Sequence, residues 1–181
     1  VGCNACVSSR IAVADFAPNR SQTRCLTRNQ ALRVSIEPPY CNDERLALYQ
    51  RYLGSRHAGG GMDGAGAADF EQFLQARWCD TRFLCVRDGE RLVGGAVTDV
   101  TPIGLSAVYT FFDPEMANRS LGVYCILQQI AWAKRLSVSH LYLGYWLEGH
   151  PKMHYKQQYQ PLETLQDGQW RRWAARIRIT E

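Results

Sequence analysis

Apolar and polar residues recur along the chain with two periods, one typical of strands and one of helices. Strand-forming runs predict strands at 11–16, 32–37, 105–112, 140–146, 162–165 and 169–178. An Asp88-Gly89 turn between two apolar runs predicts a hairpin over 82–100. Helical spacing predicts helices from Asn19 or Ser21 to about Gln30, from Asn42 or Asp43 to about His57, at about 68–78, and from Ser120 to about Leu136. A glycine-rich loop is expected over 57–68.

The order of these elements indicates the fold class. A hairpin, a third strand, a crossover helix and a fourth strand predict an α/β (α+β) fold with a mixed, mainly antiparallel central sheet flanked by helices. This order fits the GNAT acyltransferase fold, in which two central strands splay apart and the following helix points its N-terminus at a phosphate. Many other α/β folds share the same order.

The composition is that of one globular domain in a reducing compartment. The chain has 181 residues, of which 46% are hydrophobic, enough for a single sizeable core. The seven cysteines are neither an even set nor a dense one, which argues against a disulfide scaffold and for the cytoplasm. No run approaches the roughly 20 apolar residues of a membrane-spanning helix, so no membrane partner is expected.

Positive charge is concentrated near the start of the chain. Residues 1–33 contain five arginines and one acidic residue, and so carry the whole net charge of +4. Arg20, Arg24 and Arg28 recur at every fourth position and share one face of the predicted helix. A guanidinium binds oxyanions through two N–H groups, so this face suits RNA phosphates or the carboxylate of an acidic N-terminus. An ordinary solvated helix face is the alternative.

Cys3 and Cys6 have the CxxC spacing of a metal site. The pair supplies two of the four ligands that a tetrahedral Zn²⁺ requires, and the sequence contains no second CxxC. Plain thiols are the alternative interpretation.

The run Arg119-Ser120-Leu121-Gly122 begins the predicted crossover helix. Free backbone N–H groups at a helix start favour an anion. The related loop of acetyl-CoA enzymes has a small residue two positions after the glycine, whereas this chain has Tyr124, which we expect to crowd a CoA pyrophosphate. Helix capping by Ser120 is the alternative.

The run from Lys152 to Pro161 is the densest polar and aromatic segment. On a helix Lys152 and Lys156 would share one face, and Tyr155 and Tyr159 the adjacent one. Lysines bind phosphates or stabilise an oxyanion, and tyrosines stack on bases or relay a proton. A surface helix with a buried aromatic edge is the alternative.

Tyr109 and Asp113 lie at the end of the strand before the crossover helix. Ligands of open α/β sheets bind beyond the carboxyl ends of strands. Asp113 is therefore expected either to orient an amine there or to cap the turn at Pro114.

Five runs of the sequence resemble the bacterial branch of the arginyl-tRNA–protein transferase family, in order along nearly the whole chain. They are CNACVSSRIAVADFAPNRSQTR, AVTDVTPIGLSAVYTFFDPE, RSLGVYCILQQIAWAK, YLGYWLEG and KMHYKQQYQPLE, and the last is the most specific. The resemblance implies a GNAT-like catalytic half that uses aminoacyl-tRNA in place of acetyl-CoA. It also implies transfer of leucine from Leu-tRNA to proteins with N-terminal Asp or Glu, which marks them for degradation by the N-degron pathway.

The family's N-terminal part has cysteines that look like a zinc or iron–sulfur site, and Cys3 and Cys6 match the last two of them. The earlier cysteines are absent, so we expect that a further N-terminal segment precedes this chain. The resemblance divides one compact unit into residues 1–35, the end of the cysteine-containing region with the basic helix, and residues 36–181, the catalytic domain. It implies no cofactor for the chemistry and a structural zinc or iron–sulfur cluster in the longer protein.

Residue roles follow as hypotheses. Catalysis is assigned to Tyr155, Lys156 and Tyr109. Binding of tRNA phosphates is assigned to Lys152, Arg119, Ser120 and Gly122. Binding of the acceptor protein is assigned to Arg20, Arg24, Asp113 and Tyr145. Arginine is an alternative donor, as in the eukaryotic branch. A CoA-dependent N-acetyltransferase and a module that binds tRNA or acidic peptides without catalysis are the competing functions.

Overall fold

The computed structural model describes residues 5–56, 70–71, 74 and 79–174 of the chain. The glycine-rich loop predicted over 57–68 and most of the helix predicted over 68–78 lie outside these residues.

One mixed sheet organises the fold. Its strands are β1 (Val7–Ala12), β2 (Arg33–Glu37), β3 (Asp80–Asp88), β4 (Arg91–Thr101), β5 (Gly104–Phe112), β6 (His140–Trp146), β7 (Leu162–Gln166) and β8 (Gln169–Arg172). Within the described residues they form an eight-stranded sheet in the order β2-β3-β4-β5-β6-β1-β7-β8. Every pairing is antiparallel except that of β5 with β6. The predicted α/β fold with a mixed, mainly antiparallel sheet is therefore confirmed.

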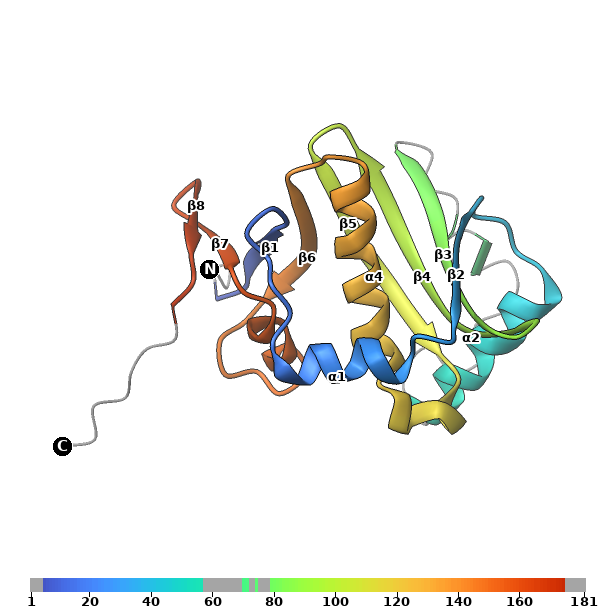
Figure 1. The fold of residues 1–181 in the computed structure, drawn as a ribbon. Coiled ribbons are helices and arrows are strands. Elements are labelled where there is room, and N and C mark those ends of the chain that lie inside the picture. Colours follow the sequence, from blue (N-terminus) through green and yellow to red (C-terminus); the bar gives the residue numbers. More distant parts are fainter. Residues whose placement is uncertain (1–4, 57–69, 72–73, 75–78, 175–181) are drawn as a thin grey trace.

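Helices cover both faces of the sheet (Figure 1). They are α1 (Arg20–Arg28), α2 (Asp43–Arg56) and α4 (Leu121–Arg135), with short 3₁₀ helices η1 (Pro114–Arg119) and η2 (His154–Gln158). Alternate residues of β3 serve the two faces, as the period of two along a strand requires. Leu84 and Val86 belong to the core under α4 and α1, whereas Phe83 and Cys85 belong to the core under α2.

The first described strand, β1, lies inside the sheet and not at its edge. β1 pairs with β6 on one side and with β7 on the other. It starts and ends earlier than the strand predicted at 11–16, because the chain turns at 13–15 toward α1. β2 runs through the boundary predicted between residues 35 and 36. β1 and β2 thus belong to the same sheet as the strands that follow residue 36.

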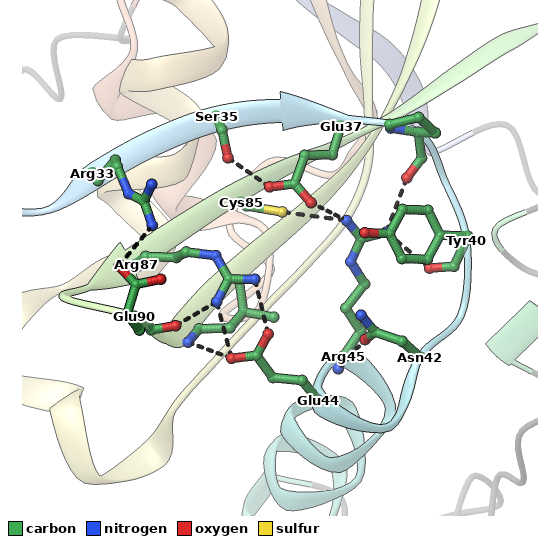
Figure 2. Close-up of polar contacts among 12 residues, drawn as sticks. Arg33, Ser35, Glu37, Tyr40, Asn42, Glu44, Arg45, Cys85, Arg87 and Glu90 are labelled. Atoms are coloured by element: carbon green, nitrogen blue, oxygen red, sulfur yellow. Dashed lines mark hydrogen bonds and ion pairs between the residues drawn. The ribbon is translucent and has the colours of Figure 1, made fainter.

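A buried arginine fixes the connection between β2 and α2 (Figure 2). The Arg45 side chain is fully buried and donates to the carbonyls of Pro38 at 2.9 Å and Tyr40 at 2.8 Å. It also binds the Glu37 carboxylate and lies against the rings of Tyr40 at 4.0 Å and Phe83 at 4.4 Å. The first turn of α2 is thereby held to β2 and β3.

A second ion pair joins the same turn to the β3–β4 hairpin. Both carboxylate oxygens of Glu44 accept from Arg87, at 3.0 and 2.8 Å, and one also accepts from the backbone N–H of Leu92 at 2.9 Å. Figure 2 shows this pair beside the Arg45 network. The two contacts fix where the aromatic residues of α2 meet the sheet.

Glu37→Gln is expected to lower the free energy of unfolding by about 1–3 kcal/mol at pH 7, because it removes the carboxylate partner of a buried guanidinium. Burial alone would raise the pKa of Glu37, but hydrogen bonds from Ser35 and Cys85 and the charge of Arg45 lower it overall. The stabilisation is therefore present above the unfolded pKa of about 4.3 and is lost as the pH falls through the folded pKa. Urea unfolding between neutral and acidic pH measures this loss.

The matched control for Glu37→Gln is Glu90→Gln. The Glu90 side chain is 96% exposed and lies 3.5 Å from Arg33. Its replacement should change stability by less than about 0.5 kcal/mol. Equal effects of the two substitutions would contradict the role given to the Arg45 network.

Candidate functional site

The two central strands separate toward their carboxyl ends. β5 and β6 pair only from Gly104 to Ser106 and from His140 to Tyr142. Among the described strands, β5 beyond that point pairs with β4 alone and β6 with β1 alone. This separation is what the GNAT-like prediction required, and it leaves backbone groups of the facing edges without a strand partner.

The side chain of Lys156 extends from η2 to the point where β5 and β6 separate. Its ammonium donates to the carbonyls of Leu143 at 2.6 Å and Tyr145 at 2.5 Å, both beyond the last parallel pair of β6. The side chain is buried, and this burial lowers the pKa of Lys156 to about 8. Among the described residues no carboxylate forms an ion pair with it. The ammonium thus takes the place of the hydrogen bonds that β5 no longer provides.

Lys152 and Lys156 do not share a helical face, contrary to the prediction. η2 begins at His154, and Lys152 precedes it in an exposed turn. The hydrogen bonds that Lys156 forms with β6 turn its side chain inward. Of these two lysines, only Lys152 is exposed and can bind a phosphate from solvent.

Tyr155 and Tyr109 are brought together around Tyr52 of α2. Burial, and then the neighbouring Tyr52 hydroxyl, raises the pKa of Tyr155, whose side chain remains partly exposed. The Tyr52 ring packs edge-on against Tyr109, with centroids 6.3 Å apart. It also contacts Phe112, with centroids 5.1 Å apart. The sequence alone did not single out Tyr52, because an aromatic residue on a helix face is usually part of the core.

Gly122 connects this aromatic group with the start of α4. A Cβ atom at Gly122 would lie 3.2 Å from Cε1 of Phe112, closer than most such contacts. Glycine therefore lets the first turn of α4 approach the end of β5. Since Phe112 contacts Tyr52, a continuous set of contacts joins the start of α4 to Tyr155 and η2.

Ser120 does not cap α4 with its side chain, so that alternative is wrong. Its backbone is left-handed, with φ 56° and ψ 45°, and its hydroxyl forms no capping bond. The turn is held from α1 instead. Asn29 Nδ2 donates to the carbonyl of Arg119 at 2.9 Å, and the Cys25 thiol contacts the carbonyl of Ser120 at 3.6 Å. These two residues were missed by sequence reasoning because only the tertiary fold brings them to this turn.

Arg119, assigned to phosphate binding, and Tyr124, expected to exclude CoA, lie in different environments. The Arg119 guanidinium is partly exposed and lies 3.9 Å from the Asp88 carboxylate. Tyr124 is buried in the core under α4. The expectation that its ring crowds a CoA pyrophosphate is therefore not supported.

Asp113 has the capping role that the sequence left as the alternative. Its buried carboxylate accepts from the N–H of Glu115 at 3.0 Å and caps η1. The same carboxylate binds Arg91 and lies 3.6 Å from Arg51. Because these contacts occupy it, we do not retain Asp113 as a residue that binds the acceptor.

The remaining acceptor residues are exposed. Tyr145 is 65% exposed at the end of β6, where its carbonyl accepts from Lys156. Arg20 and Arg24 lie on the exposed side of α1. The structure thus brings η2, the ends of β5 and β6, and the start of α4 to one end of the sheet.

The CxxC pair is only partly described. Cys3 lies outside the described residues, and Cys6 is a free, exposed thiol before β1. Within the described part of the chain no three His, Cys, Asp or Glu side chains are grouped to hold a metal ion. The metal site stays a prediction. No described helix is long and apolar enough to span a membrane.

Comparison with known sequences gives a family match and close relatives. The family model described as "Arginine-tRNA-protein transferase, C terminus" matches residues 44–166. A protein named aspartate/glutamate leucyltransferase from Stenotrophomonas maltophilia strain R551-3 is 55% identical over 174 residues, which cover 93% of this chain and 69% of the relative. One of the same name from Xanthomonas euvesicatoria is 54% identical over 173 residues, covering 92% and 69%.

Comparison with solved structures shows the fold alone. The C-terminal domain of a lysylphosphatidylglycerol synthetase from Agrobacterium fabrum has a TM-score of 0.58 at 12% identity, covering 78% of this chain and 46% of that chain. L-PGS from Bacillus licheniformis has a TM-score of 0.54 at 14% identity, covering 81% and 48%.

The pH dependence of the stability of a Lys156→Met variant tests whether burial lowers the pKa of Lys156. A folded-state pKa near 8, below the ordinary value of about 10.4, means that the unfolded chain binds this proton more tightly. The stability contributed by Lys156 should therefore rise by about 1 kcal/mol per pH unit between pH 8 and 10. Urea unfolding of wild type and variant across this range gives the difference. Lys152→Met should behave as wild type, and identical slopes for Lys156→Met and wild type would contradict the assignment.

Proposed function

Because this chain belongs to the arginine-tRNA-protein transferase family, we propose that it transfers leucine from leucyl-tRNA to the α-amine of proteins that begin with Asp or Glu. It is an aminoacyltransferase whose donor is an aminoacyl-tRNA. The choice of leucine and of acidic N-termini is supported by one observation above all. Over 93% of its length the chain is 55% identical to a protein named for that donor and those acceptors.

The proposed reaction exchanges an ester for an amide. The neutral α-amine of the acceptor attacks the carbonyl carbon of the aminoacyl ester, a C–N bond forms, and the C–O bond to the ribose breaks. The amine loses a proton and the leaving ribose oxygen gains one. An α-amine has a pKa of about 7.7–8.0, so an appreciable fraction is neutral near pH 7. Positioning of the two substrates can therefore supply much of the rate.

We place the ester carbonyl beside Lys156. An ammonium has three N–H groups, and two of those of Lys156 are used by the carbonyls of Leu143 and Tyr145. The third is available to the oxyanion of the tetrahedral intermediate. Because β6 holds the ammonium in place, little reorganisation accompanies this interaction.

Tyr155 is the proposed proton donor to the ribose oxygen, with Tyr109 as the alternative across Tyr52. An ordinary tyrosine, with a pKa of about 10, is protonated at neutral pH, and burial raises the pKa of Tyr155 further. A protonated phenol can donate, as the leaving oxygen requires. Lys152, Arg119 and the N–H groups at the start of α4, with Ser120 and Gly122, are proposed to meet phosphates of the RNA. Tyr145 is proposed to border the acceptor.

Labelled Leu-tRNA and peptides that begin with Asp, Glu or Ala test the proposal directly. The Asp and Glu peptides should acquire leucine and the Ala peptide should not. Arg-tRNA offered in parallel decides between the two donors. Acetyl-CoA should neither acetylate the peptides nor raise the melting temperature. Transfer of arginine in place of leucine, or acetylation, would replace the proposed function by the corresponding alternative.

Tyr155→Phe is expected to lower kcat for leucine transfer about 100-fold with little change in either KM, because it removes only the proton donor. Tyr40→Phe is the matched control. Tyr40 is also partly exposed, but its ring serves to cover Arg45, so loss of its hydroxyl should leave kcat unchanged. A wild-type kcat in the Tyr155→Phe enzyme would show that Tyr155 is not the proton donor, and would leave Tyr109 or solvent in that role.

A further inference from the structure

Helix α1 bridges the two segments that carry the site. At its start the side-chain amides of Asn19 and Gln22 both donate to the carbonyl of Gln158 at the end of η2, at 3.3 and 3.1 Å. At its end Asn29 donates to the carbonyl of Arg119, and the Arg28 guanidinium donates to that of Asn118. Figure 1 shows α1 crossing the base of α4. The helix therefore joins η2 to the turn before α4.

The outer face of α1 is cationic, and in the described part of the chain no acidic side chain pairs with Arg20 or Arg24. Gln22, Cys25 and Asn29 are buried on the inner face. Arg20 and Arg24 are exposed on the opposite face, and within the described residues neither forms an ion pair or hydrogen bond. The helix contains no acidic residue.

This arrangement costs the isolated helix stability. Arg20 is its first residue, where the positive end of the helix dipole disfavours a cation. Arg20, Arg24 and Arg28 follow one another at spacings of four, and like charges at that spacing repel. An external anion with repeating charges would relieve both effects along the whole row.

Building on the proposed function, we propose that the outer face of α1 binds phosphates of the donor tRNA's 3′ strand through Arg20 and Arg24. A row of cations suits a repeating polyanion, whereas a single acidic side chain needs one or two guanidinium groups. The side chain of an acceptor's first residue is also attached to the same Cα as the reacting amine. It must be bound close to Lys156, and Arg20 and Arg24 face away from the elements that α1 joins. Helix α1 thus borders the path along which the RNA enters the site.

The test separates RNA binding from transfer. Binding of uncharged leucine tRNA is measured as a function of salt for wild type, for the Arg20→Ala/Arg24→Ala double variant, and for Arg135→Ala. Arg135 is also exposed, but lies at the far end of α4. The double variant should bind about tenfold more weakly at low salt. Its slope of log K against log salt should be shallower by roughly 1.4, which is the loss of two single-strand phosphate contacts.

The same proteins are then assayed for leucine transfer with the Asp peptide varied. In the double variant KM for the charged tRNA should rise and KM for the peptide should not, whereas Arg135→Ala should match wild type. The melting temperature of the double variant at low salt should equal or exceed that of wild type, since repulsion between the arginines of α1 is removed. An unchanged salt slope, or a rise in peptide KM alone, would overturn the RNA assignment and favour acceptor binding. If the wild type shows arginine-dependent RNA binding but transfers no leucine, the proposed function fails while this surface assignment stands.

Discussion

The hydrogen bonds between the Lys156 ammonium and two carbonyls of β6 are the interaction on which the site depends. Two parallel strands that separate leave polar backbone atoms facing each other without partners, and buried atoms of this kind cost free energy. A lysine from a later segment supplies the missing donors at 2.6 and 2.5 Å. The separation of β5 and β6 can therefore persist inside the protein, with an ammonium fixed where the strands part.

The surrounding elements are arranged around that point. On the α2 side of the sheet, Tyr52 joins Tyr109 of β5 to Tyr155 of η2. On the other side, Tyr159 of the same segment is buried under α4 and stacks with Phe16 at 6.5 Å. One short segment therefore contacts both cores and keeps its lysine between them. The ion pairs Arg45–Glu37 and Arg87–Glu44 hold the start of α2 against the sheet. The side-chain amide of Gln22 holds α1 against the segment that carries Lys156.

The fold was largely predictable from the sequence, whereas the geometry of the site was only partly so. Helix α1 with its Asn19 cap, helices α2 and α4, the hairpin at Gly89 and strand β6 follow from local patterns that the structure confirms. Local patterns could not predict that Lys156 points inward, because the carbonyls that attract it belong to a distant strand. They also could not tell that Asp113 is occupied by Arg91, or that β1 lies between β6 and β7. Each of these outcomes depends on partners far along the chain.

The position of β1 has a consequence for how the protein is made. Ser9 contacts Gly144 across 135 residues of sequence, and β1 has β6 and β7 as its only strand neighbours in the described sheet. At typical translation rates the ribosome reaches those strands roughly ten seconds after it has made β1. Both edges of β1 stay open during that interval and are available to other nascent chains. Such long-range pairing also slows folding, so completion of the sheet is a late event that a chaperone can protect.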